Sequence, residues 1–190
     1  MSGKGSFGFH PRFLTMVMAK LVPHGEASVH PIRFSQLGDA QKAETLQQCR
    51  ELTDSIYPGL DVEREIRAVD DQHLGDTVLI MNESGLAAFA VCHSGAGSEA
   101  GSGVCYVKFA AARSGRTAER DFLMLLRGCE QFAVERKATR LLAGVNTGRS
   151  QAYRLMLSQR FRAELLGLVM ERGNEAGYNH EGVYLIDDWR

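Results

Sequence analysis

The sequence predicts a single α/β (α+β) domain, in which helices flank a mixed, mostly antiparallel sheet of about six to seven strands with one parallel crossover. Three observations lead to this fold class. The 190 residues suit one ordinary domain with its own core. Hydrophobic residues make up 44% and charged residues 24%, which is typical of a globular protein. Helical and strand periodicities alternate along the chain, and we find no internal repeat.

The N-terminal segment, residues 1–27, is expected to be a flexible leader ahead of a domain spanning residues 28–190. Its apolar run is at the lower size limit for a signal peptide, and Lys20 stands where a cleavage region should begin. A start of translation at Met16 or Met18 is left open. No run approaches the ~18 apolar residues of a membrane span. We therefore expect a cytoplasmic protein without a membrane partner.

The domain is expected to begin with a short strand and two helices. Residues 29–34 predict the strand. Asp39 precedes a helical stretch to about Ile56, in which apolar residues recur at helical spacing from Leu46, and Pro58-Gly59 ends this helix. A second, short helix is expected over residues 62–69.

Three consecutive strands follow these helices. Residues 78–80 and 86–91 flank Asn82-Glu83-Ser84-Gly85, which is a hairpin signature. Residues 94–103 are mostly Gly, Ser and Ala, so we expect a flexible loop there. Residues 104–111 alternate between apolar and polar side chains and predict the third strand.

The clearest helix of the chain begins at Ala118, where apolar residues form the stripe of a helix that lies on a sheet. Residues 141–145 predict a buried strand, and residues 149–159 predict another helix. Two further strands, residues 165–170 and 183–186, close the chain. Because a helix separates the third strand from residues 141–145, these two strands should pair in parallel.

Charge and cysteine content argue against several function classes. The net charge of −1 shows no basic excess, so we expect no nucleic-acid partner. We find no HExxH motif or paired His/Cys cluster, so we expect no metal. The cysteines form no C-x-x-C pair and lie in apolar stretches, which predicts reduced thiols in the core: Cys49, Cys92, Cys105 and Cys129.

The strongest local signal for chemistry is the turn between the third strand and the helix at Ala118. A small-residue turn that opens a long helix presents backbone N–H groups and a helix dipole, which together bind phosphate. An ordinary solvated turn is an equally weighted alternative. The residues concerned are Phe109, Ala110, Ala111, Arg113, Ser114, Gly115, Arg116, Thr117 and Ala118.

A second signal lies at the end of the strand over residues 141–145, which runs into Asn146-Thr147-Gly148. Parallel strands that diverge at their C-terminal ends create a cleft. An extended pantetheine arm can enter such a cleft, because its amides pair with exposed backbone as a missing strand would. Asn146 could hydrogen-bond this arm or cap the following turn, and both roles stay open.

The chain resembles the GCN5-related N-acetyltransferase (GNAT) family in element order over residues 29–187. The acyl-CoA loop of the family reads Gln/Arg-x-x-Gly-x-Gly/Ala. This sequence matches it at Arg113 and Ala118, whereas Arg116 replaces the central glycine and Gly115 lies one place early. The C-terminal segment looks like that of a bacterial branch of the family whose substrate is undefined.

A later motif of the family reads roughly Asn-x-x-Ala-x-x-Leu-Tyr-x-x-x-Gly-Phe. Three positions of this sequence match it: Ala152, Leu155 and Phe161. Three others differ, since Arg149 stands for the asparagine, Met156 for the tyrosine and Arg160 for the glycine.

The resemblance implies an N-acetyltransferase that moves the acetyl group of acetyl-CoA to a primary amine of a small molecule or peptide by direct attack. Asn146 and Arg149 would join the turn residues in binding the cofactor, and a homodimer is left open. Met156 cannot protonate the leaving thiolate as a tyrosine would, but Tyr153, one helical turn earlier, could reach the same space or belong to the core. Candidate bases, none supported by spacing, are Asp70, Asp71, His93 and Glu99.

The sequence also has features of two rival classes of protein. The changes at Arg116 and Met156 also fit a non-catalytic domain of the same fold that binds acyl-CoA as a sensor. A serine hydrolase is less consistent with the sequence, because residues 148–152 nearly fit G-x-S-x-G but end in Ala152.

Overall fold

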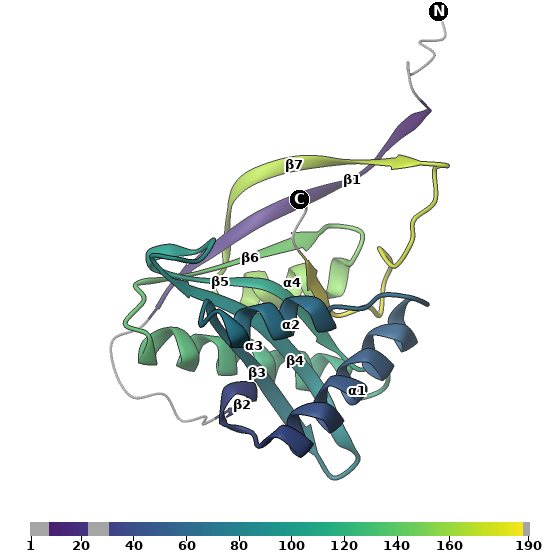
Figure 1. Ribbon diagram of the computed structural model, residues 1–190. Helices are drawn as coiled ribbons and strands as arrows, with labels where there is room; N and C mark the ends of the chain where they lie inside the picture. The colour runs from purple at the N-terminus through teal and green to yellow at the C-terminus, as the bar shows by residue number, and fades with distance from the viewer. Residues whose placement is uncertain (1–7, 23–30, 188–190) are drawn as a thin grey trace, which may run out of the picture.

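A computed structural model describes residues 8–22 and 31–187, which form one 8-stranded sheet with helices on both faces (Figure 1). The strand order is β2-β3-β4-β5-β6-β1-β7, and β8 pairs with β5. The elements in chain order are β1 (Phe9–Leu21), β2 (Ile32–Arg33), a 3-10 turn (Phe34–Gln36), α1 (Asp39–Ile56), α2 (Glu63–Asp71), β3 (Gly75–Asn82), β4 (Gly85–Gly95), β5 (Gly101–Ala112), α3 (Ala118–Glu135), β6 (Arg140–Asn146), α4 (Ser150–Ser158), β7 (Arg162–Arg172) and β8 (Leu185–Asp187).

The sheet is mixed in the way that the sequence predicts. The pair β5–β6 is parallel, from Val104 opposite Arg140 to Val107 opposite Ala143. Every other strand pair in the described part of the chain is antiparallel. Helix α3 makes the crossover between β5 and β6, so the fold class is confirmed.

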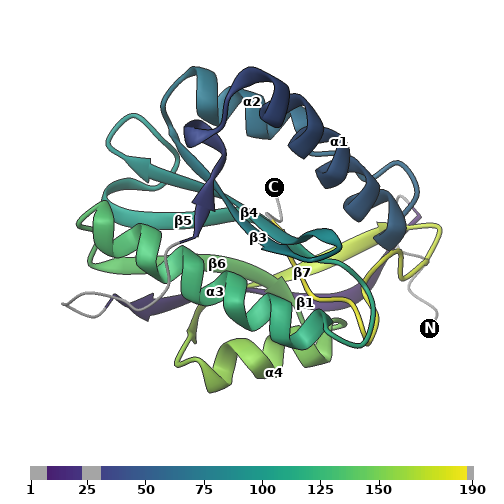
Figure 2. The same ribbon diagram turned by 90° about the horizontal axis from the view of Figure 1, so that it is seen from below.

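Two helix layers cover the sheet, with α1 and α2 on one face and α3 and α4 on the other (Figure 2). On the α3 face, Phe122, Leu125 and Phe132 are fully buried in one apolar cluster. On the α1 face, Leu52 and Ile66 are fully buried in a second cluster. All four cysteines are buried and free, as predicted, and the sulfur atoms of Cys92 and Cys129 lie 3.8 Å apart.

The prediction of a flexible leader is wrong for residues 9–21, which form β1 between β6 and β7. The apolar run that faintly imitated a signal peptide buries Met18 and Ala19 in the sheet. Burial of apolar area on both neighbouring strands favours the strand over a free segment. Residues 1–7 and 23–27 lie outside the described residues.

The strands β1 and β7 share a short repeat that the sequence analysis missed. Residues 9–20 and 161–172 align with identical residues at Phe9/Phe161, Leu14/Leu166, Val17/Val169 and Met18/Met170. The two strands pair antiparallel, and Thr15 lies opposite Gly167, its equivalent in the repeat. The pair β1–β7 therefore has a local two-fold relation.

The loop predicted over residues 94–103 is shorter in the structure, because β4 extends to Gly95 and β5 begins at Gly101. These two glycines pair with each other and adopt φ values of 100° and 72°, which glycine takes without strain. No helix in residues 8–22 and 31–187 has the length and apolar character needed to cross a membrane. Within the same residues, no group of three or more His, Cys, Asp or Glu could hold a metal ion.

Candidate functional site

The turn between β5 and α3 is open to solvent. Ser114, Gly115, Arg116 and Thr117 are all exposed. No side chain in the described part of the chain caps the N-terminus of α3. Gly115 has a φ of 145°, which is a conformation that side chains disfavour. The turn therefore presents the positive end of an 18-residue helix to solution.

The arginines at this turn have different roles. Arg113 is half-buried, and it ties the turn to β4 by donating its Nε to the carbonyl of Leu86 (3.2 Å) and its backbone N–H to that of Ala87 (2.8 Å). Arg116 is exposed, so its guanidinium is the cation available to an anion at the turn. Of the two, Arg116 is better placed to contact a ligand.

The equivalent turn between β6 and α4 is closed. Asn146 is buried, and its Oδ1 accepts a hydrogen bond from the N–H of Gly148 at 2.8 Å. Of the two roles left open for Asn146, this contact corresponds to the cap. A Cβ on Gly148 would lie 2.8 Å from the carbonyl oxygen of Asn179, so the close approach of the loop requires glycine.

Arg149, at the start of α4, is one of the largest fully buried side chains and holds β8 in place. Its guanidinium donates to the carbonyl of Leu185 (2.9 Å) and forms an ion pair with Asp187 (2.6 Å). The hydroxyl of Tyr178 donates to the second oxygen of Asp187 at 3.0 Å. Burial and the neighbouring Asp187 raise the pKa of Tyr178, which therefore stays protonated.

Strand β8 occupies the cleft predicted between β5 and β6. Phe109, Ala110 and Ala111 lie beyond the parallel pairing and pair antiparallel with Asp187, Ile186 and Leu185, in that order. On the β6 side, a Cβ on Gly144 would lie 2.7 Å from the carbonyl oxygen of Asp187, so β8 packs directly on β6. The backbone expected to receive a pantetheine arm is thus already paired within the chain.

Two cavities flank β8. One, of about 340 Å³, lies against β6, β1 and β7, and its lining includes Thr15, Asn146 and Arg149. The other, of about 370 Å³, lies between α2 and β5. Tyr178 and Asp187 line both cavities. The end of β8 and the Tyr178 ring therefore separate two spaces that would otherwise adjoin.

The cavity beside α2 carries three carboxylates, those of Asp61, Glu65 and Asp187. Oε1 of Glu65 lies 3.0 Å from Nε2 of His93. His93 is only 2% exposed, so it acts on this cavity through Glu65. Asp187 is already paired with Arg149 and Lys108 with Glu99, so Asp61 and Glu65 are the carboxylates of this lining that could attract a positively charged ligand.

The other predicted bases lie elsewhere. Asp70 pairs with Lys42 at 2.5 Å, and Glu99 pairs with Lys108 at 2.6 Å. Asp71 lines a neighbouring cavity on α2, which shares Asp61, Arg64 and Ala68 with the cavity beside β8. His93 contacts the cavity beside β8 through the carboxylate Glu65, whereas Glu99 contacts it only through the cation Lys108.

The predicted acid, Tyr153, is half-buried and packs against the core cluster under α3 and α4, and it lines neither cavity beside β8. Met156, at the family's tyrosine position, is fully buried. Glu65, Tyr178 and Asp187 were not predicted from the sequence. No motif spacing links these three residues, because only the pairing of β8 with β5 brings them together.

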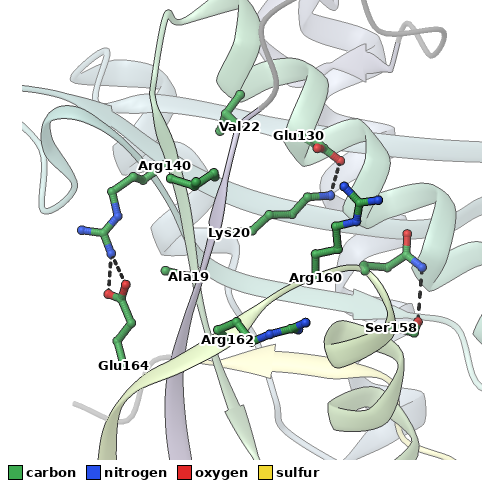
Figure 3. A pocket seen from close by; sticks show the side chains of 11 residues that line it. Ala19, Lys20, Val22, Glu130, Arg140, Ser158, Arg160, Arg162 and Glu164 are labelled. Carbon is green, nitrogen blue, oxygen red and sulfur yellow. Dashed lines mark hydrogen bonds and ion pairs between the residues drawn. The ribbon is translucent and has the colours of Figure 1, made fainter.

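A larger cavity of about 650 Å³ lies at the other end of β1, away from every predicted site residue (Figure 3). Most of its charges neutralise each other in ion pairs between Lys20 and Glu130 (2.7 Å) and between Arg140 and Glu164. Size alone does not make this cavity the functional site, since it shares no residue with either turn.

No protein-family model matches the sequence, and no curated protein matches it. Solved structures do. A GCN5-related N-acetyltransferase from Sphaerobacter thermophilus superposes with a TM-score of 0.60 and 15% identity over 87% of this chain and 53% of that one. A protein of Pyrococcus horikoshii assigned as an acetyltransferase gives a TM-score of 0.58 and 16% identity over 99% of this chain and 57% of that one.

The N-myristoyltransferase of Saccharomyces cerevisiae, solved with bound myristoyl-CoA, gives a TM-score of 0.51 and 8% identity over 84% of this chain and 47% of that one. The chain thus spans about half the length of these proteins. Identities this low show the fold alone. The chain has the GNAT fold, as its element order predicts.

Proposed function

We propose that this chain is an acyltransferase that passes an acyl group, acetyl in the simplest case, from acyl-CoA to an amine. The observation that carries the proposal is the exposed, uncapped N-terminus of α3 behind the parallel pair β5–β6. A helix N-terminus in this position suits the pyrophosphate of CoA. Arg116 would add a charge-assisted contact, with Ser114, Gly115 and Thr117 around it.

The pantetheine arm would run from this turn along residues 109–111 of β5. Those residues now pair with β8, so the arm and β8 compete for the same backbone groups. Binding of the arm would therefore require β8 to move out of the cleft. Its displacement would also join the two flanking cavities, because Asp187 and Tyr178 line both.

The acceptor amine would bind in the cavity beside α2, where Asp61 and Glu65 attract the ammonium form. Deprotonating an amine whose pKa is about 10 costs roughly 4 kcal/mol at pH 7. Glu65, paired with His93, would take this proton. The neutral amine nitrogen then attacks the thioester carbon and the C–S bond breaks. The nitrogen gives up its second proton to become the amide, and an acid donates a proton to the thiolate, which leaves as the CoA thiol.

Two phenols are candidates for the acid that protonates the thiolate. Tyr153 is the candidate from the motif, whereas Tyr178 is the one that lines both cavities. Tyr153→Phe and Tyr178→Phe should be compared for turnover, with near-UV circular dichroism to confirm folding. We expect the variant that lacks the acid to lose about tenfold or more in kcat at an unchanged KM. If neither variant loses turnover, a side-chain phenol is not the acid.

Calorimetric titration with acetyl-CoA and CoA tests whether the chain binds this cofactor. A reversible disulfide between β5 and β8 tests whether the pantetheine arm enters the cleft that β8 occupies. Ala110 and Ile186 lie directly opposite each other, at a spacing that a disulfide can bridge. In the Ala110→Cys/Ile186→Cys variant, oxidation should abolish acetyl-CoA binding and reduction should restore it. Equal binding in both states would mean that the arm does not use this cleft.

The second candidate function is a non-catalytic domain that binds its ligand without acyl transfer. The occupation of the cleft by β8 favours it, since this strand blocks the route that acyl transfer requires. Thiol release from acetyl-CoA with a panel of amines discriminates the two. CoA binding without thiol release supports the second candidate, and no binding at millimolar CoA overturns the acyltransferase proposal.

A further inference from the structure

The outer edge of β7 exposes a long apolar stripe. This strand pairs with β1 along one side, and no strand in residues 8–22 and 31–187 pairs with its other side. Leu166, Leu168 and Met170 are 58%, 56% and 46% exposed. An 11-residue apolar edge strand with unpaired backbone groups is a template for a further strand.

The stripe ends in opposite charges. Side chains two residues apart in a regular strand point to the same face, which holds for Leu166, Leu168, Met170 and Arg172. Glu164 is the extra residue of a β-bulge before this regular stretch, and it is exposed as well. Glu164 lies at one end of the three apolar residues and Arg172 at the other. An antiparallel second copy of β7 centred on Leu168 would place Leu166 opposite Met170 and Glu164 opposite Arg172.

The charges at the two ends of β7 favour pairing centred on Leu168 over pairing centred on Gly167. An antiparallel pair centred on Gly167 instead would place Arg162 opposite Arg172 at both ends, and like charges directly opposite are destabilising. With Leu168 at the centre, an opposite-charge pair closes each end of the apolar stripe. Arg140 of the same copy already contacts both oxygens of Glu164, but each carboxylate oxygen has a second lone pair that can accept from another cation.

The pairing of β7 with β1 provides an independent argument for a second copy as the partner. The strand β1 repeats the sequence of β7 at four identical positions, and the two pair antiparallel about Thr15 and Gly167. One edge of β7 thus already pairs with a strand of similar sequence. Strands of this sequence are therefore compatible as antiparallel neighbours, although this internal pair is centred on Gly167, so it supports the pairing and not the register at Leu168.

We propose that β7 pairs antiparallel with β7 of a second copy of this chain, about a two-fold axis at Leu168, so that two sheets become one. The interface is isologous, as in most homodimers. It uses the sheet edge and not the α3 turn, although Leu168 and Met170 also line the cavity of about 340 Å³ beside β8.

Sedimentation equilibrium of the full chain, from about 1 to 200 µM, measures the dimer dissociation constant. Leu168→Lys places two ammonium groups at the axis and should raise this constant about a hundredfold, since like-charge contacts cost several kcal/mol. Ile32→Lys is the matched control on β2, the other sheet edge, where Ile32 is 44% exposed. It should leave the constant unchanged. A monomer at every concentration, or dissociation caused by Ile32→Lys instead, overturns the proposal.

Cysteine cross-linking tests the register, because the four native cysteines are buried. Leu168→Cys should form a disulfide dimer under mild oxidation, since directly opposite residues lie within the spacing that a disulfide bridges. Leu166→Cys should not, because each copy's residue 166 would face Met170 of the other. Equal cross-linking of both variants, or cross-linking of Leu166→Cys alone, contradicts the two-fold axis at Leu168.

Discussion

The two turns that follow the parallel strands β5 and β6 have the same topology but opposite exposure. After β5, the turn leaves the α3 N-terminus without a side-chain cap and Arg116 exposed. After β6, Asn146 caps its own turn, and Arg149 is buried in an ion pair with Asp187. One turn presents its polar groups to solution, whereas the other uses them to hold β8.

This difference shows that a motif position specifies a place in the fold but not the role of its side chain. The resemblance assigns cofactor binding to both turns, yet a strand from the same chain has taken the polar partners of the second. A cleft created by diverging strands exposes backbone groups that must be paired by something. In this chain β8 pairs with the β5 edge.

The largest expected effect comes from Asp187→Ala, which removes the ion pair between Arg149 and Asp187 at the β6–α4 turn. This change leaves the buried Arg149 guanidinium without its carboxylate, and we expect the free energy of unfolding to fall by about 3 kcal/mol. Urea unfolding measures it. Glu175→Ala, in the exposed loop before β8, is the control and should stay within about 0.5 kcal/mol of the parent. A loss below about 1 kcal/mol for Asp187→Ala would mean that the ion pair does not hold β8.

Alkaline pH should lower the free energy of unfolding through two tyrosines near β8. Burial and the hydrogen bond to Glu119 raise the pKa of Tyr184 to about 12, and burial with Asp187 raises that of Tyr178. A folded pKa above the unfolded value of about 10 gives stability that is present below pH 10 and lost as the pH rises through 12. Urea midpoints from pH 8 to 12 should fall, and less steeply in Tyr178→Phe. An equal slope in both proteins would contradict the role of Tyr178.

The open turn can be tested with Arg116→Ala, which removes its exposed cation. If CoA phosphates bind there, the dissociation constant for CoA should rise about fivefold to tenfold, as expected for one charge-assisted contact. Calorimetry provides the measurement. Arg154→Ala removes an exposed arginine from α4 and serves as the control, with no change expected. Tighter binding by Arg116→Ala would mean that the arginine crowds the phosphates.

The smallest effect is expected at the far end of α4, where Arg160 takes the family's glycine position with a φ of 70°. A non-glycine residue in this left-handed conformation is strained. Arg160→Gly should therefore stabilise the chain by about 1 kcal/mol, seen as a higher urea midpoint. Lys137→Gly, at a φ of 55° after α3, is a parallel case. Destabilisation of both variants would show that the strain argument fails here.

Local patterns predicted the elements whose partners are near in sequence. The helix Asp39–Ile56 was predicted close to its observed bounds, and the hairpin of β3 and β4 and the crossover from β5 to β6 were also predicted. The strand β1 was missed because its partners, β6 and β7, lie more than a hundred residues further along the chain. A short apolar run carries no local sign of such a distant pairing.

The candidate site also contains both kinds of feature, one that is local in sequence and one that depends on distant contacts. The β5–α3 turn is continuous in sequence, so its dipole and cations could be predicted. Glu65, Tyr178 and Asp187 come from three distant segments and meet because β8 enters the cleft. Sequence spacing carries no information about that meeting, since it depends on which strand pairs with the β5 edge.

The insertion of β1 between β6 and β7 has a consequence during synthesis on the ribosome. Thr15 pairs with Asn146 and Gly167, so this segment emerges long before either partner exists. At about 5 to 20 residues per second, an apolar segment would wait on the order of 10 s for its place in the sheet. During that delay its exposed strand edges invite aggregation, which makes β1 the segment of this chain where a holdase chaperone would do most to protect the nascent protein.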